Sequence, residues 1–178
     1  MEEERALVER ARTDPEAFGE LYERHVNRIY AYAMRCLHDN MAAEDIVAET
    51  FERAMENLSH FEWRGPPFRA WLYRIASNAI AGRTRRAATV GLEAAPEPTD
   101  DALGPEDVLL RGERDRALMT AVGALPLLQR QAVLLRYGED LSLKDIALAL
   151  GRTDGAIKSL LHRAQCTLQR RLMPGGSS

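Results

Sequence analysis

The chain has 178 residues, of which 46% are hydrophobic and 29% charged, and its formal net charge is −3. This ordinary apolar fraction excludes a wholly disordered or fibrous chain, and no apolar run approaches the roughly 18 residues that a membrane span needs. The acidic start over residues 1–5 has no apolar core, so it is not a secretory signal. Cys36 and Cys166 lie far apart in the sequence, which favours a reducing cytoplasm over a disulfide framework.

Hydrophobic periodicity predicts three helices in the first half of the chain. Asp14 and Pro15 are typical of an N-cap followed by a first-turn proline, and Asn40 is placed to cap the second helix. Met55 belongs to the apolar face expected for that second helix. A Gly-Pro-Pro break at residues 65–67 precedes the third. The three helices are expected over about residues 15–37, 40–58 and 68–86.

The second half of the chain begins with a change of composition. Residues 88–104 contain prolines, glycines, alanines and four acids without an amphipathic period, which is typical of a linker. A helix opens at residues 105–107, and helical pieces follow at about 126–137, 142–150 and 154–172. Since no segment alternates like a strand, the fold class is all-α, with two small helical domains joined by a flexible linker. The expected boundaries are residues 1–87 and 112–173 for the domains, 88–111 for the acidic linker and 174–178 for a disordered tail.

The mild net charge conceals local charges of opposite sign. The formal charges of residues 1–87, 88–116 and 117–178 are −2, −5 and +4. Residues 39–62 hold seven acids and one base, whereas residues 63–92 hold six arginines and no acid. The average charge speaks against nucleic-acid binding, but this distribution indicates separate acidic and basic surfaces. Ordinary clustering of surface charge is the alternative interpretation.

Residues 142–163 have the spacing of a helix-turn-helix. Ile146, Leu150 and Ile157 supply a small core, and Gly151 permits the turn between the helices. The second helix is basic and can enter a DNA major groove, whereas the alternative is a plain helical hairpin with a solvated basic face. The candidate DNA contacts here are Arg152, Thr153, Lys158, Ser159, His162 and Arg163.

Aromatic residues and arginines alternate around the start of the third helix. Five of the eleven aromatics lie within residues 61–73. Because aromatic rings stack on unpaired bases while arginines follow phosphates, the pattern favours single-stranded DNA. In the alternative, Phe68 and Trp71 are core residues and the arginines are only solvated. Phe61 and Trp63 in the preceding loop are the better candidates for bases. The full candidate set is Phe61, Trp63, Arg64, Trp71, Arg74, Asn78, Arg85 and Arg86.

Acidic residues form a stripe along one face of the second helix, at spacings of four, three and four. Like charges at such spacings cost about 0.2–0.5 kcal/mol each, so the stripe favours a basic protein partner over a surface that only promotes solubility. A divalent-metal nuclease site is disfavoured, because its ligands should converge in a cleft. The residues of this acidic stripe are Asp45, Glu49, Glu52 and Glu56.

Metal and enzyme chemistry find little support in the sequence. Cys36 with His38, and His162 with Cys166, are possible ligand pairs, but structural zinc needs about four ligands and nothing brings the pairs together. The chain has no nucleotide-binding loop, nucleophile elbow or paired-carboxylate pattern. We therefore expect no metal, no cofactor and no enzymatic activity.

Four passages, in this order, resemble the extracytoplasmic-function (ECF) group of bacterial sigma-70 family RNA polymerase sigma factors. The resemblance covers roughly residues 14–86 and 112–172, and the combination of passages is far more specific than any one of them. The passages are residues 43–54 (AEDIVAETFERA), residues 70–78 (AWLYRIASN), Leu125-Pro126 with Gln129-Arg130, and residues 157–164 (IKSLLHRA).

The resemblance implies a cytoplasmic bacterial sigma factor that binds core polymerase, recognises a two-part promoter and promotes its melting. The N-terminal domain would be region 2-like: its acidic stripe would dock on the polymerase clamp helices, and residues 63–78 would melt the downstream element and capture a flipped base. The region 4-like C-terminal domain would contact the polymerase flap and read the upstream element. An anti-sigma factor is the further implied partner, without membrane insertion. The alternatives are a helix-turn-helix regulator that does not join polymerase and a metal-dependent nucleic-acid enzyme.

Two positions and one short segment depart from the family pattern. Ala48 stands where glutamine is frequent, which puts one polymerase contact in doubt, and Leu160 replaces a frequent arginine, which puts a phosphate contact in doubt. Residues 63–67 form a stiff variant of the base-capturing loop, so its base preference is open.

The predicted linker is long enough for a two-part promoter. Elements ~17 base pairs apart are separated by ~58 Å at ~3.4 Å per pair. A linker of about 25 residues extends to at most ~80 Å. Its acidity discourages it from lying on DNA.

Overall fold

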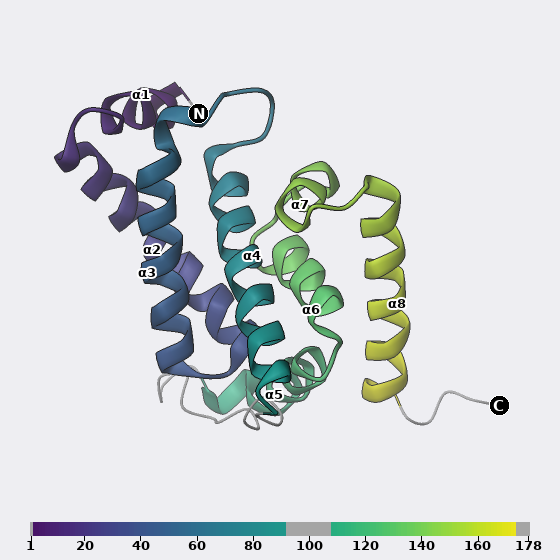
Figure 1. The fold of residues 1–178 in the computed structure, drawn as a ribbon. Helices are drawn as coiled ribbons and strands as arrows, with labels where there is room; N and C mark the ends of the chain where they lie inside the picture. Colours follow the sequence, from purple (N-terminus) through teal and green to yellow (C-terminus); the bar gives the residue numbers. More distant parts are fainter. Residues whose placement is uncertain (1, 92–107, 174–178) are drawn as a thin grey trace.

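The computed structural model describes residues 2–91 and 108–173, and the regular structure of these two segments is entirely helical (Figure 1). None of their helices combines the length and hydrophobicity that crossing a membrane requires. Most of the predicted linker, the helix start at residues 105–107 and the tail at 174–178 lie outside the described residues. The elements are α1 (Glu2–Ala11), α2 (Pro15–Leu37), α3 (Asn40–Asn57), the 3-10 turn η1 (Leu58–His60), α4 (Phe68–Thr89), α5 (Val108–Gly123), α6 (Leu127–Val133), the π turn η3 (Leu134–Gly138), α7 (Leu143–Leu150) and α8 (Asp154–Leu172).

The helix starts follow local capping chemistry. The Asp14 carboxylate accepts a first-turn N–H at 3.0 Å and Pro15 begins α2, which confirms the predicted cap. α3 begins at Asn40, but its cap is Asp39, whose carboxylate also accepts a first-turn N–H at 3.0 Å. The predicted cap was therefore wrong by one residue, because two neighbouring residues can both cap a helix.

The α1 helix is absent from the sequence-based prediction. Six of its ten residues are charged, so its short apolar stripe is easily overlooked. Leu7, Val8 and Ala11 on that stripe are buried, and α1 packs against α2. Glu4 adds a polar contact, with one carboxylate oxygen 3.2 Å from Nε2 of His25 on α2. In Figure 1 α1 lies at the end of the bundle where α3 is connected to α4.

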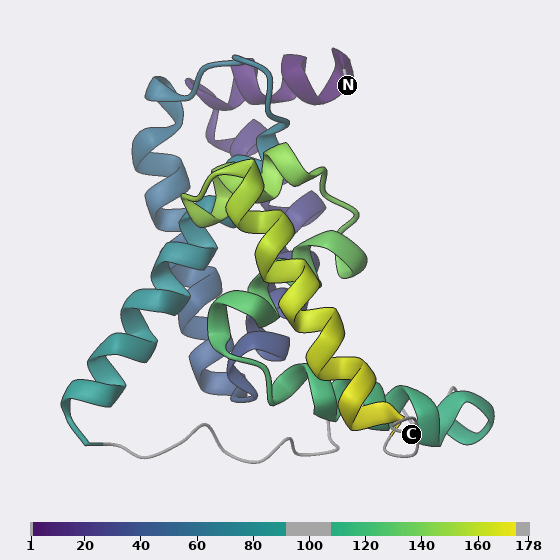
Figure 2. The same cartoon turned by 90° about the vertical axis from the view of Figure 1, so that its right-hand side faces the viewer.

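The N-terminal domain is a bundle in which α2, α3 and α4 lie side by side (Figures 1 and 2). Leu21 and Ile29 of α2, Ile46 of α3 and Leu72 of α4 belong to its buried core, each at most 1% exposed. The burial of such side chains contributes roughly 1.5–3 kcal/mol each to folding and fixes α4 relative to α3.

The C-terminal domain contains the predicted helix-turn-helix. The Ser142 hydroxyl accepts a first-turn N–H of α7 at 3.1 Å, and Thr153 does the same for α8 at 3.2 Å. Gly151 ends α7 with φ +62°, a left-handed conformation that suits glycine and confirms the predicted turn. Ile146 and Ile157 are fully buried between the two helices. The helix predicted over residues 126–137 is α6 followed by the π turn η3.

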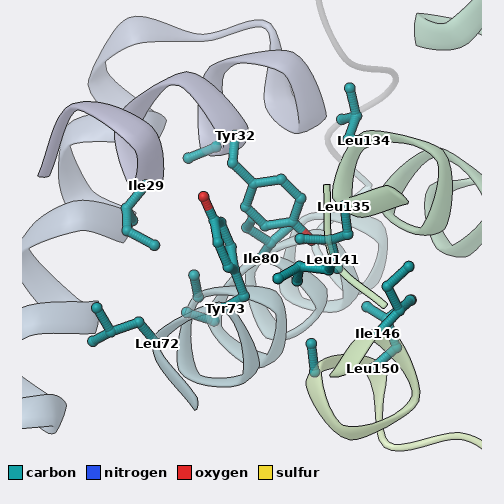
Figure 3. Close-up of a cluster of buried hydrophobic side chains, with 14 of the residues drawn as sticks. Ile29, Tyr32, Leu72, Tyr73, Ile80, Leu134, Leu135, Leu141, Ile146 and Leu150 are labelled. Atoms are coloured by element: carbon teal, nitrogen blue, oxygen red, sulfur yellow. The ribbon is translucent and has the colours of Figure 1, made fainter. Parts of the chain in front are cut away.

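The two domains pack against each other, which the sequence did not predict. α7 lies along α4, and side chains from both domains form one continuous buried cluster (Figure 3). Such continuity means that separation of the domains would expose apolar surface from both. The labelled members are Ile29, Tyr32, Leu72, Tyr73 and Ile80 from the N-terminal domain, and Leu134, Leu135, Leu141, Ile146 and Leu150 from the C-terminal domain.

Polar contacts at backbone carbonyls add to this interdomain interface. The Arg69 guanidinium on α4 donates to the carbonyl of Glu139 at 3.1 Å and of Asp140 at 3.5 Å, directly before α7. The buried Gln131 amide of α6 donates to the carbonyl of Ser77 at 3.5 Å. Because these contacts are directional, they select one orientation of the two domains.

The two cysteines differ in their access to solvent. Cys36 is 1% exposed, and burial raises the pKa of its thiol to about 12. Cys166 on α8 is only partly buried. A thiol that is both buried and protonated is inert, because the thiolate is the nucleophile.

We expect a thiol reagent at pH 8 to label one cysteine in the folded protein and two after unfolding in urea. Counting labels by mass spectrometry measures this directly. In the control variant Cys166→Ser, the folded protein should take up no label. Rapid labelling of folded Cys166→Ser would contradict the burial of Cys36.

Candidate nucleic-acid interface

The α8 helix presents its candidate DNA contacts to solvent. Lys158, Ser159, His162 and Arg163 are exposed, whereas Ile157 on the same helix is fully buried against the domain core. The helix is therefore amphipathic, with an apolar side that fixes its position and a polar side that is open. Of the remaining candidates, Arg152 and Thr153 are exposed at the start of α8.

Two residues near this surface have structural roles. Thr153 caps α8 through its hydroxyl, so its oxygen already accepts one hydrogen bond. Leu160 is 8% exposed and belongs to the hydrophobic core. Leu160, which stands where arginine is frequent in the family, therefore packs in the core.

One side of α4 is basic and open. Arg74, Asn78 and Arg85 are exposed and Trp71 is half-buried. At ~100° per residue these four positions fall within ~60° of one another around the helix axis. Arg69, which contacts the C-terminal domain, lies on the far side of the helix, so the interdomain interface leaves the basic side uncovered. Arg86 is exposed in the last turn of α4.

The aromatic residues before and within α4 form one cluster centred on Phe61. The Phe61 ring centroid lies 5.1 Å from those of Trp63 and Trp71, and 5.4 Å from that of Phe68. Phe61 is 6% exposed, so its ring has no open face for a base in this arrangement, and its part in base binding stays a prediction. Its apolar neighbours from α4 explain the burial. Trp63 is half-buried and Arg64 is exposed, so both stay accessible.

A hollow of about 490 Å³ opens beside this cluster. One wall is the loop over residues 59–64, including Trp63, and the other is α1, through Arg5, Glu9 and Arg12. The loop was predicted as part of a binding site from its aromatic residues, but no α1 residue was. The arginines of α1 could have suggested a second basic wall. Because α1 itself was not predicted, nothing in the sequence placed them beside the loop.

The acidic stripe of α3 is exposed except for Glu49, which is half-buried. Asp45 lies 3.1 Å from Arg83 of α4, and Glu49 lies 2.7 Å from Arg53 on its own helix, so two of the four carboxylates are already paired. Glu52 and Glu56 are exposed.

Two exposed methionines lie beside the stripe, one before its first carboxylate and one between its last two. Met41 and Met55 are 76% and 60% exposed, and with Ala48 and Glu52 they lie along one line of α3. The prediction that Met55 belongs to the apolar face was wrong. The buried side at this turn is formed by Ala54 and Leu58, and Met55 points to solvent. The surface thus combines carboxylates with exposed apolar side chains, a composition suited to a protein partner.

The possible metal ligands His162 and Cys166 lie close together but do not form a metal site. Nε2 of His162 lies 3.7 Å from Sγ of Cys166 on α8. Within the described residues there is no group of three or more His, Cys, Asp or Glu side chains that could hold a metal ion.

Comparison with known proteins supplies the family context. The Sigma-70 region 2 model matches residues 21–89, and the Sigma-70, region 4 model matches residues 115–164. The chain is 37% identical over 174 residues to the ECF RNA polymerase sigma factor BldN of Streptomyces coelicolor, covering 93% of this chain and 64% of BldN. It is 31% identical over 170 residues to the ECF RNA polymerase sigma factor SigW of Bacillus subtilis, covering 89% of this chain and 90% of SigW. The chain thus spans less than two thirds of BldN and most of SigW.

Two solved structures have a similar fold. The structure of CnrH in complex with the cytosolic domain of CnrY gives a TM-score of 0.69 at 26% identity, covering 97% of this chain and 98% of CnrH. The sigma factor RpoE of Bartonella quintana, in complex with the anti-sigma factor NepR, gives 0.71 at 25% identity, covering 90% of this chain and 98% of RpoE.

Proposed function

Because the chain belongs to the ECF group of sigma-70 family sigma factors, we propose that it binds core RNA polymerase, recognises a two-part promoter and promotes its melting. The observation that supports this most strongly is the presence of three separate exposed surfaces in one chain. They are the acidic stripe of α3, the basic side of α4 and the polar side of α8. A helix-turn-helix regulator that never joins polymerase needs only the last of these.

The acidic stripe is the proposed docking surface for the clamp helices of polymerase, and the C-terminal domain would contact the flap. Glu52 and Glu56 are exposed and form no ion pair within the described residues, while Met41 and Met55 offer flexible apolar contacts. Asp45 and Glu49 would exchange their present partners for basic groups of polymerase. Ala48, between these groups, supplies no hydrogen bond of its own.

The downstream promoter element would be bound by the basic side of α4 and the loop before it. Arg74, Arg85 and Arg86 would follow phosphates, Asn78 would read a base edge, and Trp63 would stack on an unpaired base. The open side of α4 next to the half-buried rings of Trp63 and Trp71 supports this division.

The upstream element would be read by α8 in the major groove. We expect Arg163→Ala to weaken binding to this duplex by about 1–3 kcal/mol, because the exposed guanidinium is placed to contact a base. Fluorescence anisotropy with holoenzyme and a labelled promoter duplex measures the change. Gln165→Ala, on the opposite side of α8, is the matched control and should leave the affinity unchanged. Equal losses in the two variants would remove Arg163 from the reading surface.

Binding of both elements at once requires the domains to separate. α7 packs on α4 and α8 packs on α7, so α8 lies about two interhelical distances, ~20 Å, from α4. Promoter elements ~17 base pairs apart are ~58 Å apart. We propose that the packed arrangement belongs to the free protein and that polymerase holds the two domains apart.

The remaining parts of the proposal concern regulation and setting. The RpoE structure contains an anti-sigma factor, which supports a regulator of that class for this chain. Sigma factors work in the bacterial cytoplasm and have no catalytic activity of their own. We propose the same location and the same absence of catalysis for this chain.

Run-off transcription with purified core polymerase tests the proposal. A pool of genomic templates should yield specific transcripts only when this chain is added, and their start sites define the promoter. The absence of any transcript that depends on the chain would reject the sigma-factor proposal.

A further inference from the structure

The unpredicted helix α1 holds the loop before α4 by its main chain. The Arg12 guanidinium donates to the carbonyl of Phe61 at 2.7 Å and approaches that of Ser59 at 3.5 Å. Its Nε lies 3.1 Å from a carboxylate oxygen of Glu9, one turn earlier on α1. The side chain is only 28% exposed, so these charge-assisted contacts are partly shielded from water.

Two main-chain hydrogen bonds also hold the loop: the Phe61 N–H donates to the Leu58 carbonyl at 3.2 Å, and the Arg64 N–H donates to that of Glu62 at 2.9 Å. Residues 61–67 belong to no helix, and the rings of Phe61 and Trp63 are anchored in the aromatic cluster, with Phe61 the more deeply buried of the two. Arg12 fixes the backbone of the same residue, so both main chain and ring of Phe61 are held. Trp63, two residues later, packs edge-on against that ring at 5.1 Å between centroids. Trp63 is therefore coupled through the Phe61 ring to a residue whose carbonyl Arg12 holds.

The surroundings of Trp63 are suited to a ligand. The indole lines the hollow of about 490 Å³, which is within the usual volume range of small-molecule pockets. Its buried Nε1–H has no hydrogen-bond partner among the described residues. This N–H is enclosed in the structure, so the part of the indole that a ligand in the hollow can reach is its half-buried ring.

We infer that Arg12 is a positioning residue for base capture: it holds the Phe61–Trp63 loop in the shape that accepts an unpaired base of the opened promoter. The inference rests on the proposed function and deepens it, because it assigns to α1 a role that neither the sequence motifs nor the family comparisons indicate. Arg12 need not touch DNA. Its effect on the base passes through the main chain of Phe61 and the ring of Trp63.

The test compares intact and abasic DNA. The probe is a fluorescent single-stranded oligonucleotide with the non-template sequence of a promoter found by run-off transcription, and holoenzyme is the binding partner. In a series of oligonucleotides, each lacks one base. Wild-type holoenzyme should lose about tenfold in affinity when the captured base is missing, the magnitude typical of one stacked base. Holoenzyme with Arg12→Ala should bind the intact strand about tenfold more weakly and should lose little more when that base is missing.

Two further variants separate positioning from folding. Arg12→Lys keeps the charge but cannot donate from two guanidinium nitrogens, so it should restore only part of the penalty for the missing base. Arg10→Ala removes an arginine from the same helix, 62% exposed and 3.9 Å from Asp14, and should behave like wild type. If Arg12→Ala fails to fold, Arg12→Lys decides: a full wild-type penalty in it would overturn the inference.

The possible failures are distinguishable. A full abasic penalty in Arg12→Ala would overturn the inference and leave the proposed base capture intact. Wild-type holoenzyme without any base-sensitive position would overturn both. A uniform weakening of all oligonucleotides by Arg12→Ala, with the penalty unchanged, would assign to Arg12 a general structural role and would also overturn the inference.

Discussion

Cross-linking the two domains through positions 69 and 140 is expected to lower promoter-dependent transcription about tenfold or more. In the variant Arg69→Cys, Asp140→Cys and Cys166→Ser, a reducible bismaleimide would join α4 to the turn before α7. The native guanidinium of Arg69 lies 3.5 Å from the Asp140 carbonyl, so a short cross-linker fits this site. Since the packed domains place α8 far closer to α4 than a two-part promoter allows, a locked protein can engage only one element at a time. The measurement is run-off transcription before and after cross-linking.

The controls separate locking from damage. The same variant without the reagent should transcribe, and reduction of the cross-link should restore the transcript. Binding of an upstream-element duplex should survive cross-linking, because the polar side of α8 is exposed in the packed arrangement. Full transcription by the cross-linked protein would contradict domain separation.

The length of chain between the domains sets a limit on this separation. α4 ends at Thr89 and α5 begins at Val108, which leaves residues 90–107 between them, fewer than the predicted linker. Such a segment reaches about 60 Å when fully extended. That is comparable to the ~58 Å between promoter elements ~17 base pairs apart, so the segment is long enough for the domains to separate by that distance.

Features that depend on a few neighbouring residues were predictable from the sequence. The cap at Asp14, the left-handed turn at Gly151 and the exposed face of α8 each follow from local chemistry that needs no knowledge of the fold. For the same reason the acidic stripe and the basic side of α4 lie on the helices where they were expected.

Features that depend on contacts distant in the sequence were not predictable. Phe61 was interpreted as a loop residue facing DNA, but Phe68 and Trp71 bury it. The contact between Arg69 and the turn before α7 joins residues about seventy positions apart, which no local pattern encodes. Tertiary packing decided both cases.

Reversing the charge of Glu52 is expected to weaken binding to core polymerase by about tenfold to a hundredfold, or about 1.4–2.8 kcal/mol. In Glu52→Lys an exposed carboxylate at the centre of the stripe becomes an ammonium group, which would face the basic partner surface with like charge. Anisotropy titration of labelled protein with core polymerase measures the affinity. The loss should shrink as salt rises, because exposed charges are screened.

Two companion variants show whether α3 itself is the docking surface. Asp45→Lys should lose core affinity as Glu52→Lys does, but it also breaks the ion pair with Arg83, so only this variant should lower the free energy of unfolding, by up to about 1 kcal/mol. Glu23→Lys makes the same change of charge at an exposed position of α2 and should bind polymerase like wild type. If Glu23→Lys weakens binding as much as Glu52→Lys, only the overall charge matters, and the acidic stripe is not the docking surface.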